Sequence, residues 1–389
     1  MGPKIAFFRG MMRKLIGKTG KSDLGTTLLL LFLFFWISPS AAIGESYRYV
    51  DIHPSGWADS RVTCINGYGE AVGFGTTGSG ERGFLWSAGT ITEILPPGAD
   101  SARAAWINDS GDIAGTWEKD GVRHAFLLRG STFHDPTPDW GTSEATYVGV
   151  DGAVAGKGEY GAYVSRDGIT EIFPGFSSVA GGNSSGQWVG NSGTASVLFL
   201  PGRGYLNVTP PGTTDSTPHG INESGIIAVT ALQTENNTMK GYVKSGEFYI
   251  NMTPAGWNSS RAMAINDFNE VAGYGDSTAG RRSFLWSSGS TEEIAFPGWT
   301  STEAVALNND GQVAGSGTTA SGETHAFVAS PPGAAAASSP VPGTSGGCAM
   351  APHDAGGKTA GSAAESLIAI VFPLLLLRGR VRSRRATPR

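Results

Sequence analysis

The sequence predicts an all-β protein, a seven-bladed β-propeller closed by its N-terminal strand and followed by a disordered, membrane-associated C-terminal tail. A segment typified by residues 262–273, which reads as a strand, a polar turn and a second strand, recurs seven times. The turn positions are Gly69, Gly111, Gly152, Gly186, Gly225, Asn269 and Gly311, at spacings of 42, 41, 34, 39, 44 and 42 residues. The 389 residues include 58 glycines and are only 16% charged, a composition typical of short strands joined by tight turns. A period near 40 residues indicates a repeat architecture.

The first repeat shows the predicted unit. Strands are expected at residues 61–65, 70–75, 83–86 and 90–94, with turns between them. The first turn is Asn66-Gly67-Tyr68-Gly69, where Asn supplies local side-chain bonds and Gly supplies positive φ. Four strands in about 40 residues make one propeller blade.

The seventh repeat predicts how the ring closes. It stops after its third strand, at Val328, and lacks a fourth. Residues 47–52 form a predicted strand that belongs to no repeat. Pro54 and Gly56 follow it, and proline and glycine likewise follow the fourth strands of the other repeats. We therefore expect the N-terminal strand to complete the last blade and to remove two exposed edges, so that residues 45–330 form the propeller.

The N-terminal 44 residues resemble a secretory signal peptide. Six basic residues lie within the first 21, residues 28–37 are continuously apolar, and small residues follow. A basic head, a short apolar middle and a small-residue exit are typical of a cleaved signal. The alternative is an uncleaved anchor, although ten apolar residues are short for a membrane span.

The C-terminus carries a second three-part signal. Residues 331–347 form a Pro/Ala/Ser/Gly linker, and residues 348–389 hold the apolar run 367–377 followed by an arginine cluster. With Gly346, Gly347 and Cys348, this tail resembles sorting tails processed by rhombosortase-like or myxosortase-like proteases. The resemblance implies cleavage near Gly347 and Cys348, then transfer to the cell surface or release. The alternative is a plain C-terminal anchor.

The charge of the body restricts its partners. Between the basic ends, residues 45–357 hold 15 basic and 31 acidic residues, which argues against a nucleic-acid partner. We expect a monomer that contacts membrane only through its terminal signals. No metal or cofactor is expected, because Cys64 and Cys348 lack metal-site spacing and the Asn/Asp-rich turns lack the distal Glu of a calcium loop.

The repeats carry a family resemblance. The phrases Ile-Asn-x-x-Gly-x-Val-Ala-Gly and His-Ala-Phe, the latter intact at His124 and His325, resemble the HAF family of probable extracellular repeat proteins. The resemblance covers residues 47–330. It implies export and repeat architecture, and it carries no enzymatic role.

An aromatic residue usually follows the exit from each blade. The set comprises Trp57, Trp140, Phe176, Trp257 and Trp299, with Ala99 and Thr213 in the remaining two blades. The position falls on the loop that leads from the outer strand of one blade to the inner strand of the next. A partly exposed ring of aromatic side chains would bind sugars or protein side chains; the alternative is that each ring fills the gap between blades.

Charged residues recur four positions further on. The set is Arg61, Arg103, Glu144, Ala180, Thr217, Arg261 and Glu303, at the predicted channel mouth. Blade order places Glu303 between Arg261 and Arg61, and Glu144 beside Arg103, so we expect ion pairs between neighbouring blades. Alternatively, Arg61, Arg103 and Arg261 would bind an anionic ligand.

These patterns favour an exported, non-enzymatic binding or surface-interaction module in an extracytoplasmic location, with a glycan or a surface protein as partner. Catalytic residues are not expected: His53 and His219 fall in predicted loops, and no His-Glu-x-x-His motif occurs. The alternatives are a secreted propeller hydrolase or lyase acting on glycans, and a purely structural surface protein.

Overall fold

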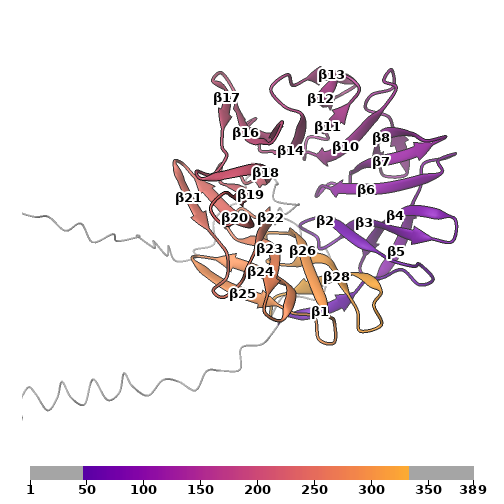
Figure 1. Cartoon of the computed structure of the whole chain (residues 1–389). Coiled ribbons are helices and arrows are strands. Elements are labelled where there is room, and N and C mark those ends of the chain that lie inside the picture. The colour runs from indigo at the N-terminus through magenta and orange to yellow at the C-terminus, as the bar shows by residue number, and fades with distance from the viewer. Residues whose placement is uncertain (1–46, 333–389) are drawn as a thin grey trace, which may run out of the picture. The chain divides into compact units, whose positions relative to one another are not determined.

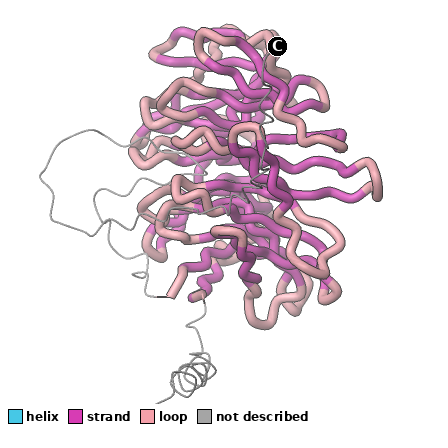
Figure 2. Tube along the Cα trace, turned by 90° about the vertical axis from the view of Figure 1, so that its left-hand side faces the viewer, coloured by secondary structure: helices cyan, strands magenta, loops and turns pink. Residues whose placement is uncertain are grey.

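The computed structural model describes residues 47–332, and every regular element within them is a strand. The strands form seven antiparallel four-stranded sheets arranged as blades around a common axis (Figure 1). Seen from the side, strands make up the body and loops lie at its edges (Figure 2). The predicted seven-bladed propeller is therefore confirmed.

Each blade runs from an inner strand at the axis to an outer strand at the rim. Blade 1 is β2 (Arg61–Ile65), β3 (Ala71–Thr77), β4 (Gly80–Ser87) and β5 (Thr90–Ile94). Blade 2 is β6 (Ser101–Ile107), β7 (Ile113–Lys119), β8 (Val122–Arg129) and β9 (Thr132–His134). Blade 3 is β10 (Ser143–Val148), β11 (Val154–Gly158), β12 (Gly161–Arg166) and β13 (Ile169–Ile172). Blade 4 is β14 (Ser178–Gly182), β15 (Trp188–Ser192), β16 (Ala195–Leu200) and β17 (Gly204–Asn207).

The remaining blades follow the same order. Blade 5 is β18 (Thr213–Ile221), β19 (Ile227–Gln233), β20 (Thr238–Ser245) and β21 (Phe248–Asn251). Blade 6 is β22 (Arg261–Ile265), β23 (Val271–Ser277), β24 (Gly280–Ser287) and β25 (Ser290–Ile294). Blade 7 is β26 (Ser301–Leu307), β27 (Val313–Thr318), β28 (Thr324–Ser330) and the N-terminal strand β1 (Arg48–Asp51).

The N-terminal strand closes the ring as the sequence predicts. Strand β1 pairs antiparallel with β28, from Arg48 opposite Ser330 to Asp51 opposite Phe327. The carboxylate of Asp51 lies 2.8 Å from Nδ1 of His325, which adds a side-chain contact between the two strands. Blade 7 is thus built from both ends of the described chain, and its third strand has no exposed edge.

The turns between the first and second strands have the backbone that the repeat predicts. The seven turn positions, Gly69, Gly111, Gly152, Gly186, Gly225, Asn269 and Gly311, all have positive φ, between 64° and 78°. In the first repeat, Oδ1 of Asn66 accepts hydrogen bonds from the backbone N–H groups of Tyr68 and Glu70. The asparagine side chain therefore shapes the turn through its own hydrogen bonds.

The same asparagines also join neighbouring blades. Six side-chain amide bonds of 2.7–3.3 Å reach a backbone carbonyl of the next blade: Asn66 to Asn108, Asn108 to Gly149, Asn183 to Asn222, Asn222 to Asn266, Asn266 to Asn308, and Asn308 to Asn66. We call this set the asparagine belt. It is interrupted between blades 3 and 4, because position 149 is glycine and has no side chain to donate.

Small residues allow the strands to pack closely. A Cβ atom added to Gly73 would overlap the carbonyl oxygen of Arg61 on the neighbouring strand, and Gly273 and Gly315 are placed in the same way against Arg261 and Glu303. The third strands supply large buried rings such as Phe84, which is fully buried. Glycine on the second strand thus makes room for an aromatic ring on the third.

Several sequence predictions lie outside the described residues. These are the signal peptide at residues 1–44, the linker beyond residue 332, the tail at residues 348–389, and the processing residues Gly346, Gly347 and Cys348. Among residues 47–332, no helix is long and apolar enough to cross a membrane.

Candidate functional site

The five predicted aromatic residues occupy one repeated turn on the loops that lead from each blade to the next. In each, the backbone N–H bonds to the carbonyl three residues earlier: Trp57 to Pro54, Trp140 to Thr137, Phe176 to Phe173, Trp257 to Pro254 and Trp299 to Phe296. We call the face that carries these loops the crossover face. The equivalence of the five positions, inferred from spacing, is visible in this shared turn.

The aromatic rings pack against the blade that follows them. Trp57 meets Phe84 edge-on, with ring centroids 6.0 Å apart, and Trp257 meets Phe284 at the same distance. A Cβ atom added to Gly317 would lie 2.6 Å from the indole of Trp299, so that ring rests directly on the second strand. Phe176 is buried and the four tryptophans are half-buried. The rings therefore support blade packing, and the tryptophans keep some surface exposed.

The charged residues do join neighbouring blades, although with different partners from those expected. Arg103 donates to Glu81, with Nη2 at 2.7 Å, and its guanidinium lies 4.5 Å from the ring centre of Phe74. Glu144 pairs with Arg123 at 2.7 Å, and Glu303 pairs with Arg281 at 2.7 Å.

Each of these partners lies on the third strand of the preceding blade, not on the neighbouring inner strand. Hydrogen bonds from Arg123 and Lys157 lower the pKa of Glu144, even though its burial opposes ionisation. Arg261 lies over the ring of Tyr274 at 5.9 Å, and Arg61 is exposed at the start of β2.

Blade 4 departs from the predicted alignment. A Cβ atom added to Gly190 would overlap the carbonyl oxygen of Ser178, just as one added to Gly73 would overlap that of Arg61. Ser178 therefore occupies the position of Arg61, and the assignment of Ala180 to that position was wrong. The loop that leads into β14 is two residues shorter than its counterparts, so counting from Phe176 overshoots.

Each inner strand also has a β-bulge that the sequence did not reveal. The ladder shifts register around one equivalent, half-buried residue in every blade: Thr63, Ala105, Thr146, Ala180, His219, Met263 and Val305. His219 is the one titratable residue in this set, and it lies in strand β18 rather than in the expected loop. Burial, with a smaller contribution from the charge of Arg261, lowers the pKa of His219 to about 4.

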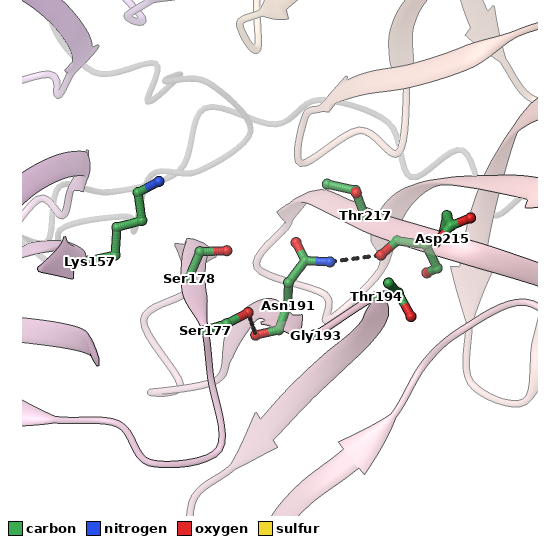
Figure 3. Close-up of a pocket in the computed structure, with 9 residues that line it drawn as sticks. Lys157, Ser177, Ser178, Asn191, Gly193, Thr194, Asp215 and Thr217 are labelled. Carbon is green, nitrogen blue, oxygen red and sulfur yellow. Dashed lines mark hydrogen bonds between the residues drawn. The ribbon is translucent and has the colours of Figure 1, made fainter. Parts of the chain in front are cut away.

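A polar pocket of about 410 Å³ opens on the crossover face above blade 4, and we call it the blade-4 pocket (Figure 3). Its lining comes from blades 3, 4 and 5 and consists of Lys157, Ser177, Ser178, Asn191, Gly193, Thr194, Asp215, Ser216 and Thr217. Lys157 and Asp215 lie at opposite sides, with Ser178, Asn191 and Thr217 between them (Figure 3). The short loop and the serine in place of arginine leave this space open.

Hydrogen bonds hold the floor of the blade-4 pocket in place. Nδ2 of Asn191 donates to the carbonyl of Ser216 at 2.7 Å, which links blade 4 to blade 5. Oγ of Ser177 donates to the carbonyl of Asn191 at 3.0 Å. Asp215 has a φ of 44°, an uncommon backbone conformation for a residue other than glycine, beside a second register shift in β18. Uncommon backbone conformations concentrate at functional positions, which makes this wall a candidate contact.

The chemistry of the lining suits polar binding. Hydroxyl groups both donate and accept hydrogen bonds, and Oδ1 of Asn191 adds a further acceptor, since its NH₂ group already bonds to Ser216 and Ala195. One ammonium and one carboxylate flank these neutral groups. Within residues 47–332, no three His, Cys, Asp or Glu side chains are grouped so that they could hold a metal ion.

Comparisons with known proteins assign no family to the chain. No family model matches the chain, and no curated protein matches it. Among solved structures, it is similar to TolB from Acinetobacter baumannii, with 11% identity, a TM-score of 0.36, and coverage of 72% of this chain and 65% of that one. It is also similar to YCF48 bound to D1 peptide, with 12% identity, a TM-score of 0.46, and coverage of 75% and 97%.

The chain thus spans less than two thirds of the TolB chain. The sheet topology defines a protein of the seven-bladed propeller class, without a family assignment.

Proposed function

We propose that this chain is an exported, non-enzymatic binding module whose ligand occupies the blade-4 pocket. The observation that carries the proposal is the break in the ring's repetition at blade 4, where a shortened loop and Ser178 leave an open volume walled by three blades. Ligand pockets combine a concave surface with a few well-placed polar groups, and this pocket has both.

The lining favours a ligand rich in hydroxyl groups, such as a glycan on a cell surface or a glycosylated surface protein. The hydroxyls of Ser178, Thr194 and Thr217 can exchange hydrogen bonds with ligand hydroxyls in either direction. Lys157 and Asp215 carry opposite charges, so the pocket has no strong preference for one sign. Membership of the HAF family of extracellular repeat proteins, proposed from the repeat phrases, fits the same role.

The test fills the pocket with the side chain that other blades carry. Ser178→Arg places at β14 the residue found at the equivalent positions of β2, β6 and β22, so the blade should tolerate it. The matched control is Ser192→Arg, an exposed serine on the next strand of the same blade. We expect the full chain to bind spots on an immobilised glycan array and Ser178→Arg to lose at least one of the glycans that the parent binds. Equal binding by both variants, or no binding by the parent, would refute the proposal.

Export is proposed from the two terminal signals. The mature protein should lack residues 1–44 and the segment after about Gly347. Mass spectrometry of the native protein measures both ends, and an intact arginine-rich tail would reduce the C-terminal signal to a plain anchor.

A further inference from the structure

A second groove, of about 500 Å³, lies between the outer parts of blades 5 and 6. Its lining is Asn251, Met252, Thr253, Pro254, Ala255, Trp257, Trp286, Gly289, Thr291 and Glu293. None of these residues lines the blade-4 pocket. We call it the indole groove, because two tryptophans form part of it.

The indoles are fixed by the packing of blade 6. Trp257 lies on the loop between β21 and β22 and meets Phe284 of β24 edge-on, at 6.0 Å and 80°. Trp286 is two residues further along β24, so it faces the same side of the sheet as Phe284, and it is 9% exposed. Strand β25 places Thr291 opposite Trp286 and Glu293 opposite Phe284, on that same side. The groove therefore has rigid aromatic surface next to polar groups.

The polar groups of the indole groove can form further hydrogen bonds. Oδ1 of Asn251 accepts the backbone N–H of Thr253 at 2.9 Å, which orients the amide and leaves its NH₂ donors without a hydrogen bond among the described residues. The carboxylate of Glu293 is 3.7 Å from Nε of Arg282, with its side chain 47% exposed. At that distance and exposure the pair is weak, so the carboxylate can accept hydrogen bonds from a ligand.

The repeat supplies an internal comparison. Blade 1 aligns with blade 6 without gaps when the residue numbers differ by 200, so the interface between blades 7 and 1 has the same two indoles, Trp57 and Trp86. There, His53 replaces Thr253 and stacks on His325 at 3.9 Å, and Ile91 replaces Thr291 and packs against the core. Larger side chains thus occupy the space that two threonines leave open between blades 5 and 6.

From this geometry we infer that the indole groove binds one sugar ring of a neutral glycan, whose apolar C–H face packs on the indoles while its hydroxyls bond to Asn251, Thr291 and Glu293. Indoles offer flat apolar surface with a polar edge, which suits a ring that is apolar on its faces and polar around its rim. The carboxylate of Glu293 and the acidic body disfavour anionic sugars. This inference rests on the proposed binding function and adds a second site and a ligand class. The experiment below tests the indole groove separately from the blade-4 pocket.

The experiment titrates the full chain with three neutral hexasaccharides, of glucose, N-acetylglucosamine and mannose, and with the anionic hexamer of galacturonate. Calorimetry gives the affinity, and tryptophan fluorescence reports on the indoles. The double variant Thr253→His/Thr291→Ile introduces into blade 6 the residues that blade 1 has at the equivalent positions. The blade should therefore tolerate both substitutions. We expect at least one neutral hexasaccharide to bind, and the double variant to bind it about tenfold more weakly or worse.

The matched control is Ser192→Arg, an exposed serine that lines neither pocket and should leave this affinity unchanged, and Ser178→Arg is titrated beside it to separate the two sites. If no neutral hexasaccharide binds, or if the double variant binds as the parent does, the groove is not a sugar site. If galacturonate hexamer binds as tightly as the best neutral sugar, the neutral ligand class is wrong. A loss of affinity in Ser178→Arg alone would assign sugar binding to the blade-4 pocket and overturn the inference.

Discussion

Replacing Trp299 by alanine separates the two roles that the aromatic positions can have. The indole stacks on Phe296 at 4.1 Å and meets Phe327 edge-on at 5.9 Å, and it rests on Gly317 of β27. Truncation of a buried tryptophan costs about 3–5 kcal/mol, and because Trp299 is half-buried the lower end applies, about 3 kcal/mol. For a unit of this size, each kcal/mol lowers the melting temperature by about 2–3 °C, so Trp299→Ala should melt about 6–9 °C below the parent.

Thermal unfolding followed by circular dichroism measures the effect, with Phe268→Ala as the matched control. Phe268 is also aromatic and lies in a turn, but it is 69% exposed. Its truncation should change the unfolding free energy by less than about 0.5 kcal/mol. If Trp299→Ala melts as the parent does, the packing argument fails, and the indole becomes a surface available for ligands.

Three further predictions concern the ring. Removing the chain before Asp51 should expose the edge of β28 and cause self-association, measured by light scattering; a monomeric truncated protein of parental stability would contradict closure by β1. Asn308→Ala removes a buried amide that bonds to the carbonyl of Asn66 at 3.0 Å and to its own turn. It should lower the free energy of unfolding, measured in urea, by about 3 kcal/mol. A decrease below about 1 kcal/mol would show that the asparagine belt contributes little to stability. Burial lowers the pKa of His219 to about 4, so the unfolded chain binds a proton more readily than the folded chain. The contribution of His219 to the free energy of unfolding should therefore be fully present above about pH 6.5 and be lost as the pH falls toward 4. His219→Gln should reduce the difference in melting temperature between about pH 7.5 and pH 5, and an unchanged difference would contradict this assignment.

The repeat made the fold predictable, because its signals are local. Glycine and asparagine adopt positive φ most readily, and all seven turn positions found from spacing have it. The closing strand was predictable for a related reason: a missing fourth strand at one end and an unassigned strand at the other complete each other.

The details of the candidate site were not predictable, because they depend on how blades meet. Arg103 pairs with Glu81 across a blade interface, and nothing in the repeat pattern indicates that third strands supply the partners. Counting from Phe176 assumed a loop of constant length, so Ala180 was misplaced. His219 was expected in a loop, although it lies in strand β18. Both cavities arise from small residues at positions where other blades carry large ones, and such differences become visible only after the blades are superposed.

The pairing of β1 with β28 has a consequence for the order in which the protein can form. The first strand to be synthesised must wait until about residue 330 has been made before it finds its partner. Such a long-range contact is slow to form, since the chain between its ends must be ordered first. Three of the four residues of β1 remain exposed even in the finished ring, and they include Arg48 and Asp51. A charged strand of this kind is poorly suited to pair with other chains, so β1 should not aggregate while it is still unpaired. The ring therefore has a defined last step, and a chain that stops before β28 would be left with seven inner strands and no way to close.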